Sequence, residues 1–327
     1  MRADKKRPMV ISVSRKTDIP AFYADWFINR VREGYCTVPN PFNPKQVARI
    51  SLEPKDVVAF VFWTRNPRPL MRYLKELDER GYRYYFQYTI LGYPREIDPK
   101  SPSLEVSLET FKELSEHVGN LRVIWRYDPI VFSSITEPEY HVERHARIAE
   151  QLRGYCERNV ISIVDDYRKT AKRIENLERQ DIKFYKWNQD LHGEVIRKIA
   201  DTAKRNGMEI FSCAEDIDLT PYGVKKGKCV DDDLISKLWG SVIPRKLEYR
   251  KDRGQREVCG CTESRDIGMY DSCLFGCVYC YATSCFKKAQ ENHHKEHDPC
   301  SPSLLGHYEV NQPQAELPLF DELVEVE

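Results

Sequence analysis

The sequence predicts an α/β fold in which parallel strands form a partial (β/α)6 TIM-like barrel, and two observations carry that prediction. Before the cysteine-rich C-terminal region, short apolar runs rich in β-branched and aromatic residues alternate with stretches of helical period. Such alternation is typical of parallel strands joined by crossover helices. The chain contains six of these strand-helix units. Six units favour a partial barrel, although an open, doubly wound sheet has the same periodicity and stays as the alternative.

Each predicted strand leads into a polar cluster. In chain order these clusters read SRKTDIP, WTRNP, QYT, RYDP, DDY and CAED. Because the carboxyl ends of parallel strands form the ligand-binding face of such folds, we expect the clusters to meet at one mouth. The strands are expected at Met9 to Ser14, Val57 to Trp63, Tyr82 to Thr89, Leu121 to Trp125, Val160 to Val164 and Met208 to Ser212.

The predicted helices lie between these strands and carry apolar residues at intervals of three and four. A further helix, Asp231 to Trp239, follows the sixth strand. Residues 1–240 therefore form the barrel, 241–295 a basic linker with a cysteine-rich segment, and 296–327 a flexible tail rich in proline, serine and acidic residues. The other helices are expected at Ala21 to Arg32, Pro67 to Arg80, Ser107 to His117, Pro138 to Leu152, Lys169 to Arg179 and Gly193 to Asn206.

The charge of the chain is balanced overall and uneven locally. It has 51 Lys and Arg against 51 Asp and Glu, which gives no global case for nucleic-acid binding. Residues 243–256 hold six Arg or Lys, whereas 296–327 hold eight acidic residues and no Lys or Arg. Either segment on its own reads as solvated surface. We expect a cytoplasmic protein, because no apolar run approaches a membrane span or a signal peptide.

Eleven cysteines are present, and seven of them follow position 258. In a cytoplasmic chain such clustering indicates metal ligation rather than disulfides. Cys273, Cys277 and Cys280 have intervals of three and two residues, so one short loop can hold three corners of a [4Fe-4S] cluster and leave the fourth iron open. A zinc site, which usually pairs two CxxC units, or a chance grouping of thiols is the alternative.

This segment resembles the CX3CXΦC signature of the radical S-adenosylmethionine superfamily, including an aromatic residue, Tyr279, before the last cysteine. The partial barrel of that superfamily also has six βα units. The SRKTDIP, WTRNP, CAE and CGCTESRDIGMYDSC stretches resemble an uncharacterised bacterial family, a domain of unknown function related to spore photoproduct lyase. In most of the superfamily the three cysteines follow the first strand. Here they lie near the C-terminus, so we expect their loop to fold back over the barrel mouth.

The resemblance implies that the open iron binds S-adenosyl-L-methionine and that the reduced cluster cleaves it to a 5'-deoxyadenosyl radical, which abstracts hydrogen from a substrate. It also implies a reductant such as flavodoxin or ferredoxin. For Arg126 with Asp128, a structural ion pair is an equal alternative to a ligand role. Besides Tyr279, the candidate cofactor contacts are the strand-end residues Ser14, Arg15, Thr64, Asn66, Arg126 and Glu215.

A second metal site is expected at Cys213, Cys229, Cys259 and Cys261. Four thiolates suit an auxiliary Fe-S cluster or a structural zinc that ties the sixth strand to the C-terminal segment. Gly260 lets the backbone turn tightly between the last two. No spacing recommends the other cysteines, which we expect to be small buried hydrophobes or, in one case, a hydrogen donor. These cysteines are Cys36, Cys156, Cys285 and Cys300. Three histidines could also bind a metal but read as solvated side chains: His293, His294 and His297.

The tail contains QAELPLF, from Gln314 to Phe320, which resembles the peptide that bacterial polymerases and repair proteins use to bind the DNA sliding clamp. Leu317, Leu319 and Phe320 would enter an apolar groove, while Gln314 would fix the register through hydrogen bonds. Packing of the same residues onto the protein's own domain is the alternative.

Three functions follow from these features. The first is a radical enzyme that acts on DNA or RNA in repair or modification, as the lyase resemblance, the basic segment and the clamp-like motif indicate. The second keeps the radical chemistry and directs it at a small metabolite or a peptide. The third is a non-catalytic zinc or Fe-S protein that binds nucleic acid or scaffolds a repair complex.

Overall fold

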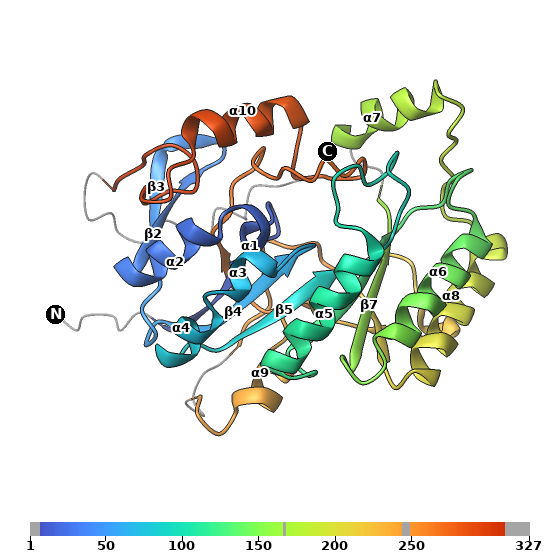
Figure 1. Cartoon of the computed structure of the whole chain (residues 1–327), viewed down its shortest axis with the longest axis horizontal. Coiled ribbons are helices and arrows are strands. Elements are labelled where there is room, and N and C mark those ends of the chain that lie inside the picture. The colour runs from blue at the N-terminus through green and yellow to red at the C-terminus, as the bar shows by residue number, and fades with distance from the viewer. Residues whose placement is uncertain (1–6, 166–167, 244–248, 311–327) are drawn as a thin grey trace.

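The architecture is that of a computed structural model, which describes residues 7–165, 168–243 and 249–310. Eight parallel strands form one sheet in the order β10-β1-β4-β5-β6-β7-β8-β9 (Figure 1). The strands are β1 (Met9–Val13), β4 (Val57–Thr64), β5 (Tyr84–Thr89), β6 (Val123–Ile130), β7 (Arg158–Ile163), β8 (Glu209–Ser212), β9 (Lys225–Lys226) and β10 (Ser264–Asp266).

The six predicted strands correspond to the six central strands, which confirms an α/β fold built on a parallel sheet. These strands are neighbours in chain order, without the reversal that a doubly wound sheet requires, so that alternative does not describe the molecule. Within the described ranges the edge strands β9 and β10 do not pair with each other, and the sheet is not a closed barrel. Both edge strands escaped prediction because two or three residues carry no periodicity.

The helices predicted between the strands are present, and two of them are broken into shorter pieces. None of those in the described ranges combines the length and the apolar character needed to cross a membrane. One helix, α10, was not expected, and a 3-10 turn at Thr220–Tyr222 precedes β9. The helices are α1 (Ile19–Phe22), α2 (Ala24–Glu33), α3 (Arg68–Met71), α4 (Leu74–Glu79), α5 (Leu104–Val118), α6 (Pro138–Gln151), α7 (Arg168–Glu178), α8 (Gln189–Arg205), α9 (Asp232–Trp239) and α10 (Phe286–Glu296).

An antiparallel hairpin of β2 (Tyr35–Asn40) and β3 (Asn43–Ser51) was also missed. Pro39 and Pro44 lie within its strands, and proline usually argues against a strand. A two-stranded ribbon tolerates proline because the outer edge of each strand has no neighbouring strand. The outer edge of β2 contacts the residues after α10, where the Thr37 N–H donates to the Pro302 carbonyl oxygen at 2.9 Å.

The flexible tail therefore does not begin at residue 296, as its composition predicted. Trp26 Nε1 and Arg30 Nη2 of α2 donate to the carbonyl oxygens of Ser301 and Cys300 at 3.0 and 2.9 Å, and Leu304 is buried. Backbone acceptors and two buried leucines, Leu304 and Leu305, hold a segment whose composition reads as disordered. The clamp-like motif of residues 314–320 lies outside the described residues.

The two faces of the sheet pack against different parts of the chain. Phe62 and Phe86 stack with ring centroids 4.9 Å apart in the apolar layer beneath α2, α5, α6 and α8. On the opposite face, Val61 and Tyr85 share a second apolar layer with α9 and three cysteines, of which Cys229 precedes α9 and Cys259 and Cys261 follow it. α9, at the bottom of Figure 1, and these flanking residues thus cover the face that the crossover helices leave open.

Candidate metal centres

The three predicted cluster ligands lie in residues 267–285, here called the cluster loop, which follows β10. Since β10 pairs in parallel with β1, the loop starts at the C-terminal end of β1. Asp266 holds this point by accepting hydrogen bonds from the hydroxyls of Ser12 and Ser14 at 2.8 and 2.7 Å. Gly268 lies so close that an added Cβ would stand 2.0 Å from Ser14 Oγ. The C-terminal loop therefore does fold back to the strand ends.

Further along, the cluster loop is held by the loop after β5 and by α7. The Val278 N–H donates to the Ile97 carbonyl oxygen at 3.1 Å. From α7, the Arg173 guanidinium donates to the carbonyl oxygens of Cys277 and Cys280. These bonds fix the backbone of the last two ligands from two independent elements.

The three thiols are close enough to interact with one another. Burial is the largest cause that raises the pKa of Cys273, to about 12, and of Cys277, and charge on a neighbouring thiolate raises both further. Within the described ranges the three sulfurs are not all within 4.8 Å of one another. Sulfurs around one zinc lie roughly 3.7 Å apart, so the three thiols are not already arranged around a single zinc ion. Binding a cation would displace the thiol protons.

Tyr279, predicted as a cofactor contact, has its hydroxyl bound inside the protein. It donates to the carboxylate of Asp98 at 3.0 Å and also contacts the guanidinium of Arg65. Arg65 in turn pairs with Asp98 at 2.7 Å, and its guanidinium lies 5.6 Å from the centre of the Tyr279 ring. All three side chains are almost wholly buried, so this triad anchors the cluster loop to the ends of β4 and β5.

Three other predicted contacts also have partners within the strand ends. Ser14 donates to Asp266, Thr64 Oγ1 accepts the Asn66 N–H at 2.9 Å, and Asn66 Oδ1 accepts the Arg68 N–H at 3.2 Å. They shape the turns that follow β1 and β4.

Asp18 and Asp98 lie at the site and were not among the predicted residues. Asp18 accepts the N–H groups of Ala21 and Arg65 at 2.9 and 2.6 Å, and burial raises its pKa to about 7. It is also near enough to raise the pKa of Cys273. Asp18 stands in the SRKTDIP cluster and could have been selected, whereas nothing in the sequence around Asp98 marks it.

The remaining predicted contacts lie by the second cysteine set. Arg126 pairs with Asp128 at 2.6 Å and also donates to Cys229 Sγ at 2.9 Å. Glu215 Oε1 accepts the Ile163 N–H at 2.8 Å, and burial raises the pKa of Glu215 to about 8. The structure thus shows the ion pair of Arg126 with Asp128 and adds a contact with Cys229, while a cofactor contact of Arg126 stays a prediction.

Arg15 stands between the two cysteine sets. The Arg15 carbonyl oxygen accepts a hydrogen bond from the hydroxyl of Tyr281, next to Cys280, at 2.8 Å. Negative charge on Cys261 raises the pKa of the Arg15 guanidinium. The guanidinium also lies 5.6 Å from the centre of the Trp63 ring. Among the described residues, Arg15 Nη2 and Trp63 Nε1 are buried donors without a hydrogen-bond partner. A ligand with acceptor atoms would satisfy both.

The second set of cysteines is brought together. Cys213 Sγ and Cys229 Sγ lie 2.7 Å apart, and the Cys261 thiol contacts those of Cys229 and Cys259. Of the other cysteines, Cys36 and Cys156 are buried as expected, whereas Cys285 and Cys300 are exposed and are not buried hydrophobes.

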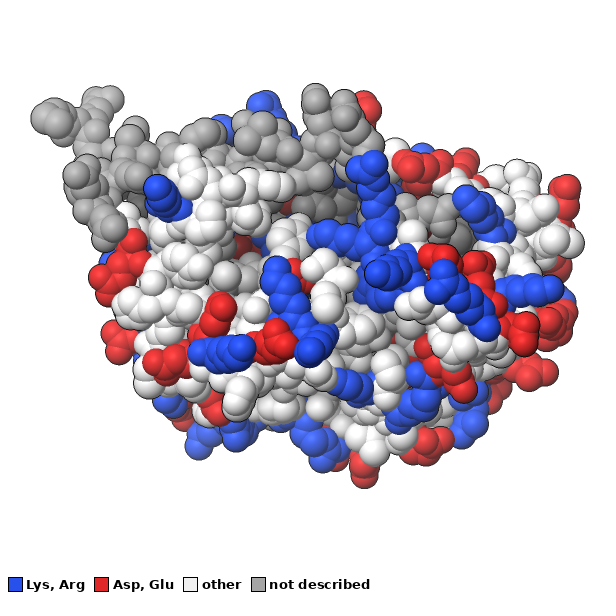
Figure 2. Space-filling model, turned by 90° about the horizontal axis from the view of Figure 1, so that it is seen from above, with Lys and Arg blue, Asp and Glu red and all other residues white. Residues whose placement is uncertain are grey.

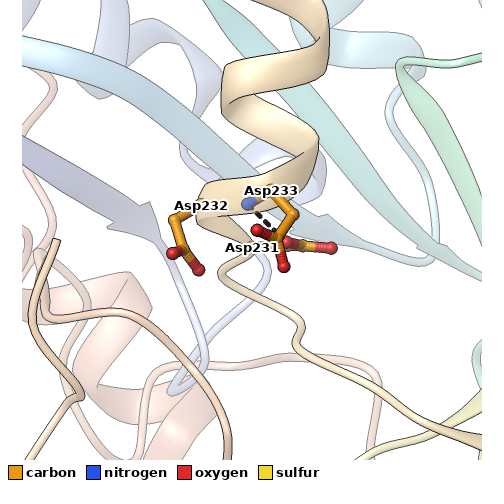
Figure 3. Close-up of side chains that lie close together, drawn as sticks. All are labelled: Asp231, Asp232 and Asp233. Atoms are coloured by element: carbon orange, nitrogen blue, oxygen red, sulfur yellow. Dashed lines mark hydrogen bonds between the residues drawn. The ribbon is translucent and has the colours of Figure 1, made fainter. Parts of the chain in front are cut away.

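Three acidic side chains at the start of α9 also lie within 4.8 Å of one another (Figure 3). Asp231 caps the helix and pairs with Arg158 at 2.5 Å. Asp232 and Asp233 both pair with Lys228, at 2.8 and 3.0 Å. Each carboxylate already has a cation, so the group is a capping arrangement rather than a metal site.

The predicted histidines differ in their surroundings. The rings of His293 and His297 stack 5.2 Å apart, and both lie edge-on to Tyr23. His297 Nδ1 is 3.0 Å from the Leu304 carbonyl oxygen. These two rings therefore pack α10 onto the body of the protein rather than being simply solvated.

No curated protein sequence and no solved structure matches the chain in the comparisons. One family does match, over residues 10–282, a span that includes all seven candidate metal ligands and ends two residues after Cys280. Since the match covers most of the sequence, the chain belongs to the family described as a domain of unknown function, DUF1848.

Proposed function

We propose that this protein is a radical S-adenosylmethionine enzyme whose [4Fe-4S] cluster is held by Cys273, Cys277 and Cys280. The observation that supports it most is the cluster loop, which carries three interacting thiols across the C-terminal ends of a parallel sheet. We further infer that the six central strands are the partial (β/α)6 barrel of that superfamily, of the spore photoproduct lyase kind. Their unreversed chain order and the crossover helices on one face support this.

The chain's own residues would hold and shield the cluster. The triad of Arg65, Asp98 and Tyr279 would fix the loop in a buried, low-dielectric setting. When bound and reduced by a protein such as flavodoxin or ferredoxin, the cluster supplies the electron that cleaves S-adenosyl-L-methionine. Two of the buried donors without a hydrogen-bond partner among the described residues are Arg15 Nη2 and Trp63 Nε1. We propose that they bind acceptor atoms of that cofactor.

We propose DNA or RNA as the substrate. Seen from the side of α7 and α10, Lys and Arg gather across the middle of the face (Figure 2). Lys16, after β1, and Lys169 of α7 lie over the Tyr270 ring, 5.2 and 4.7 Å from its centre. A cationic patch around an aromatic ring suits phosphates and a stacked base. The clamp-like motif of residues 314–320 supports the same class of substrate, because a clamp tether would deliver the enzyme to DNA.

The proposal is tested by anaerobic purification and reconstitution. The expected protein is brown, binds about four irons in the first site and, after reduction, releases 5'-deoxyadenosine from S-adenosyl-L-methionine. Cys277→Ala should abolish both the cluster signal and the cleavage. Cys300→Ala, which removes an exposed thiol outside both sets, should change neither. A colourless protein that binds zinc at Cys273, Cys277 and Cys280 would exclude the radical enzyme and leave the non-catalytic zinc protein.

A small metabolite is the second candidate substrate, and a cavity of about 130 Å³ favours it. The cavity adjoins the anchoring triad and is lined by Arg65, Thr89, Tyr93 and Asp98, among others. Binding of labelled single-stranded DNA and RNA separates the two candidates: if Lys169→Glu leaves DNA and RNA binding unchanged, the metabolite becomes the better reading.

A further inference from the structure

Three segments far apart in the sequence meet at the second set of cysteines. The end of β8 contributes Cys213, residues 227–229 contribute Cys229, and residues 259–261 contribute Cys259 and Cys261. Their thiols form a continuous row in which Cys213 Sγ and Cys229 Sγ lie 2.7 Å apart and Cys261 contacts the thiols of Cys229 and Cys259.

Two glycines make this meeting sterically feasible. An added Cβ on Gly227 would lie 2.7 Å from Phe211 Cβ and 2.8 Å from the Ser212 carbonyl oxygen of β8. On Gly260 it would lie 3.2 Å from Lys228 Cγ, so the third segment packs on the second. The segments are stacked backbone on backbone, and the thiols have little room to move apart.

Hydrogen-bond donors converge on the row. Cys261 Sγ accepts the N–H groups of Cys229 and Val230 at 3.3 and 3.4 Å. The buried Arg126 donates to Cys229 Sγ at 2.9 Å. Backbone and guanidinium N–H groups aimed at sulfur stabilise the thiolate form, which is the form that binds metals. A structural cluster of neutral thiols would have no use for them.

We propose that Cys213, Cys229, Cys259 and Cys261 bind a single tetrahedral divalent ion of the zinc class. Sulfurs around one zinc lie roughly 3.7 Å apart, because each metal-sulfur bond is about 2.3 Å, whereas a cubane spreads them to roughly 6 Å. A pair at 2.7 Å is nearer to the single ion. Among the described residues no three of the four sulfurs all lie within 4.8 Å of one another, so binding of the ion would have to draw the row together. A disulfide between Cys213 and Cys229 would not account for the two N–H groups that donate to Cys261 Sγ.

This site is distinct from the one in the cluster loop and does not depend on radical chemistry. Four protein thiolates leave no open position on a zinc ion, which is the mark of a structural rather than a catalytic site. The ion would draw the ends of the row inward. It would join β8 to the segments that cover the face of the sheet opposite the crossover helices. Four thiolates with one divalent ion carry about two negative charges, which Arg126 and Arg15 partly offset.

The test is the metal content of the natively folded protein, purified anaerobically without added metal and measured by mass spectrometry. We expect about one zinc per chain, with a zinc-edge absorption spectrum showing about four sulfur neighbours at roughly 2.3 Å. Cys261→Ser should lose that zinc and keep the iron of the cluster loop. Cys277→Ala should do the reverse. Cys156→Ser, a buried thiol outside both sets, should leave both metals in place.

The outcomes separate the two sites. About eight irons with no zinc would overturn the single ion in favour of an auxiliary cluster. Absence of any second metal, with a Cys213–Cys229 disulfide found by peptide mapping, would overturn metal binding altogether. If Cys261→Ser does not fold, the absorption spectrum of the unmodified protein still decides, because nitrogen or oxygen neighbours would contradict a four-thiolate site. Loss of the iron alone would count against the proposed function and not against this site.

Discussion

Gly268→Ala should loosen the cluster loop from the sheet. The new methyl would stand 2.0 Å from Ser14 Oγ and 2.6 Å from Ser14 Cβ, far inside contact distance. The backbone cannot yield easily, because Asp266 is bonded to the hydroxyls of Ser12 and Ser14 and to the Arg15 N–H. Overpacking of this kind costs about 1 to 3 kcal/mol. In a chain of 327 residues that lowers the unfolding temperature by roughly 1.5 to 4.5 °C.

The cause is tested by a double-mutant cycle with Ser14, followed by thermal unfolding and by iron content after reconstitution. Ser14→Gly alone removes the hydrogen bond to Asp266 and should cost about 1 kcal/mol. Combined with Gly268→Ala it also removes both clashing atoms, so the pair should be more stable than the sum of the single changes by about 1 kcal/mol or more. Additive effects, or a Gly268→Ala protein as stable as the wild type, would refute the steric argument.

Three other changes have expected outcomes. Asp98→Asn leaves the charge of Arg65 buried without its carboxylate, which should cost about 3 to 5 kcal/mol in urea unfolding and reduce iron retention. Burial lowers the pKa of His145 to about 4. The unfolded chain therefore binds a proton at His145 as the pH falls below about 6.5, whereas the folded chain does not until about pH 4. Above about pH 6.5 the folded state has no penalty from this residue, and its stability falls as the pH is lowered toward about 4. That loss is about 3 kcal/mol, and His145→Gln should flatten the pH profile of unfolding by this amount. A peptide of residues 314–327 should bind a purified bacterial sliding clamp in the micromolar range, about −8 kcal/mol by calorimetry, and Leu319→Ala should weaken it at least tenfold; no binding of the unmodified peptide would remove the clamp from the proposal.

The central sheet could be predicted because burial on both faces makes its strands continuous apolar runs. Val57 to Trp63, for example, has no polar residue and matches β4 within one residue. The hairpin could not be predicted, since Pro39 and Pro44 are signals against a strand and the contact of β2 with Pro302 is not visible in the sequence. β10 is three residues long and exists because β1 offers it an edge.

Parts of the candidate site that depend on residue type and spacing could be predicted. Contacts between residues distant in sequence could not. The cysteine intervals identified the cluster loop, and strand ends identified Arg15 and Arg126. Asp98 could not be found, because its role comes from a buried triad whose members are distant in sequence. Arg126 was expected beside the cluster ligands and donates instead to Cys229 Sγ, a contact between residues distant in sequence that no local pattern marks.

The pairing of β10 with β1 joins the first strand of the chain to residues near its end. During synthesis the six central strands leave the ribosome before any residue of the cluster loop, and the edge of β1 stays open until β10 arrives. A contact of such long sequence separation forms late, because the closure of the intervening chain is entropically costly. The thiols are then presented to a sheet that is already folded. On the function proposed above, the growing chain would expose no complete cluster site until Cys280 has been made, and metal loading would follow the folding of the central sheet.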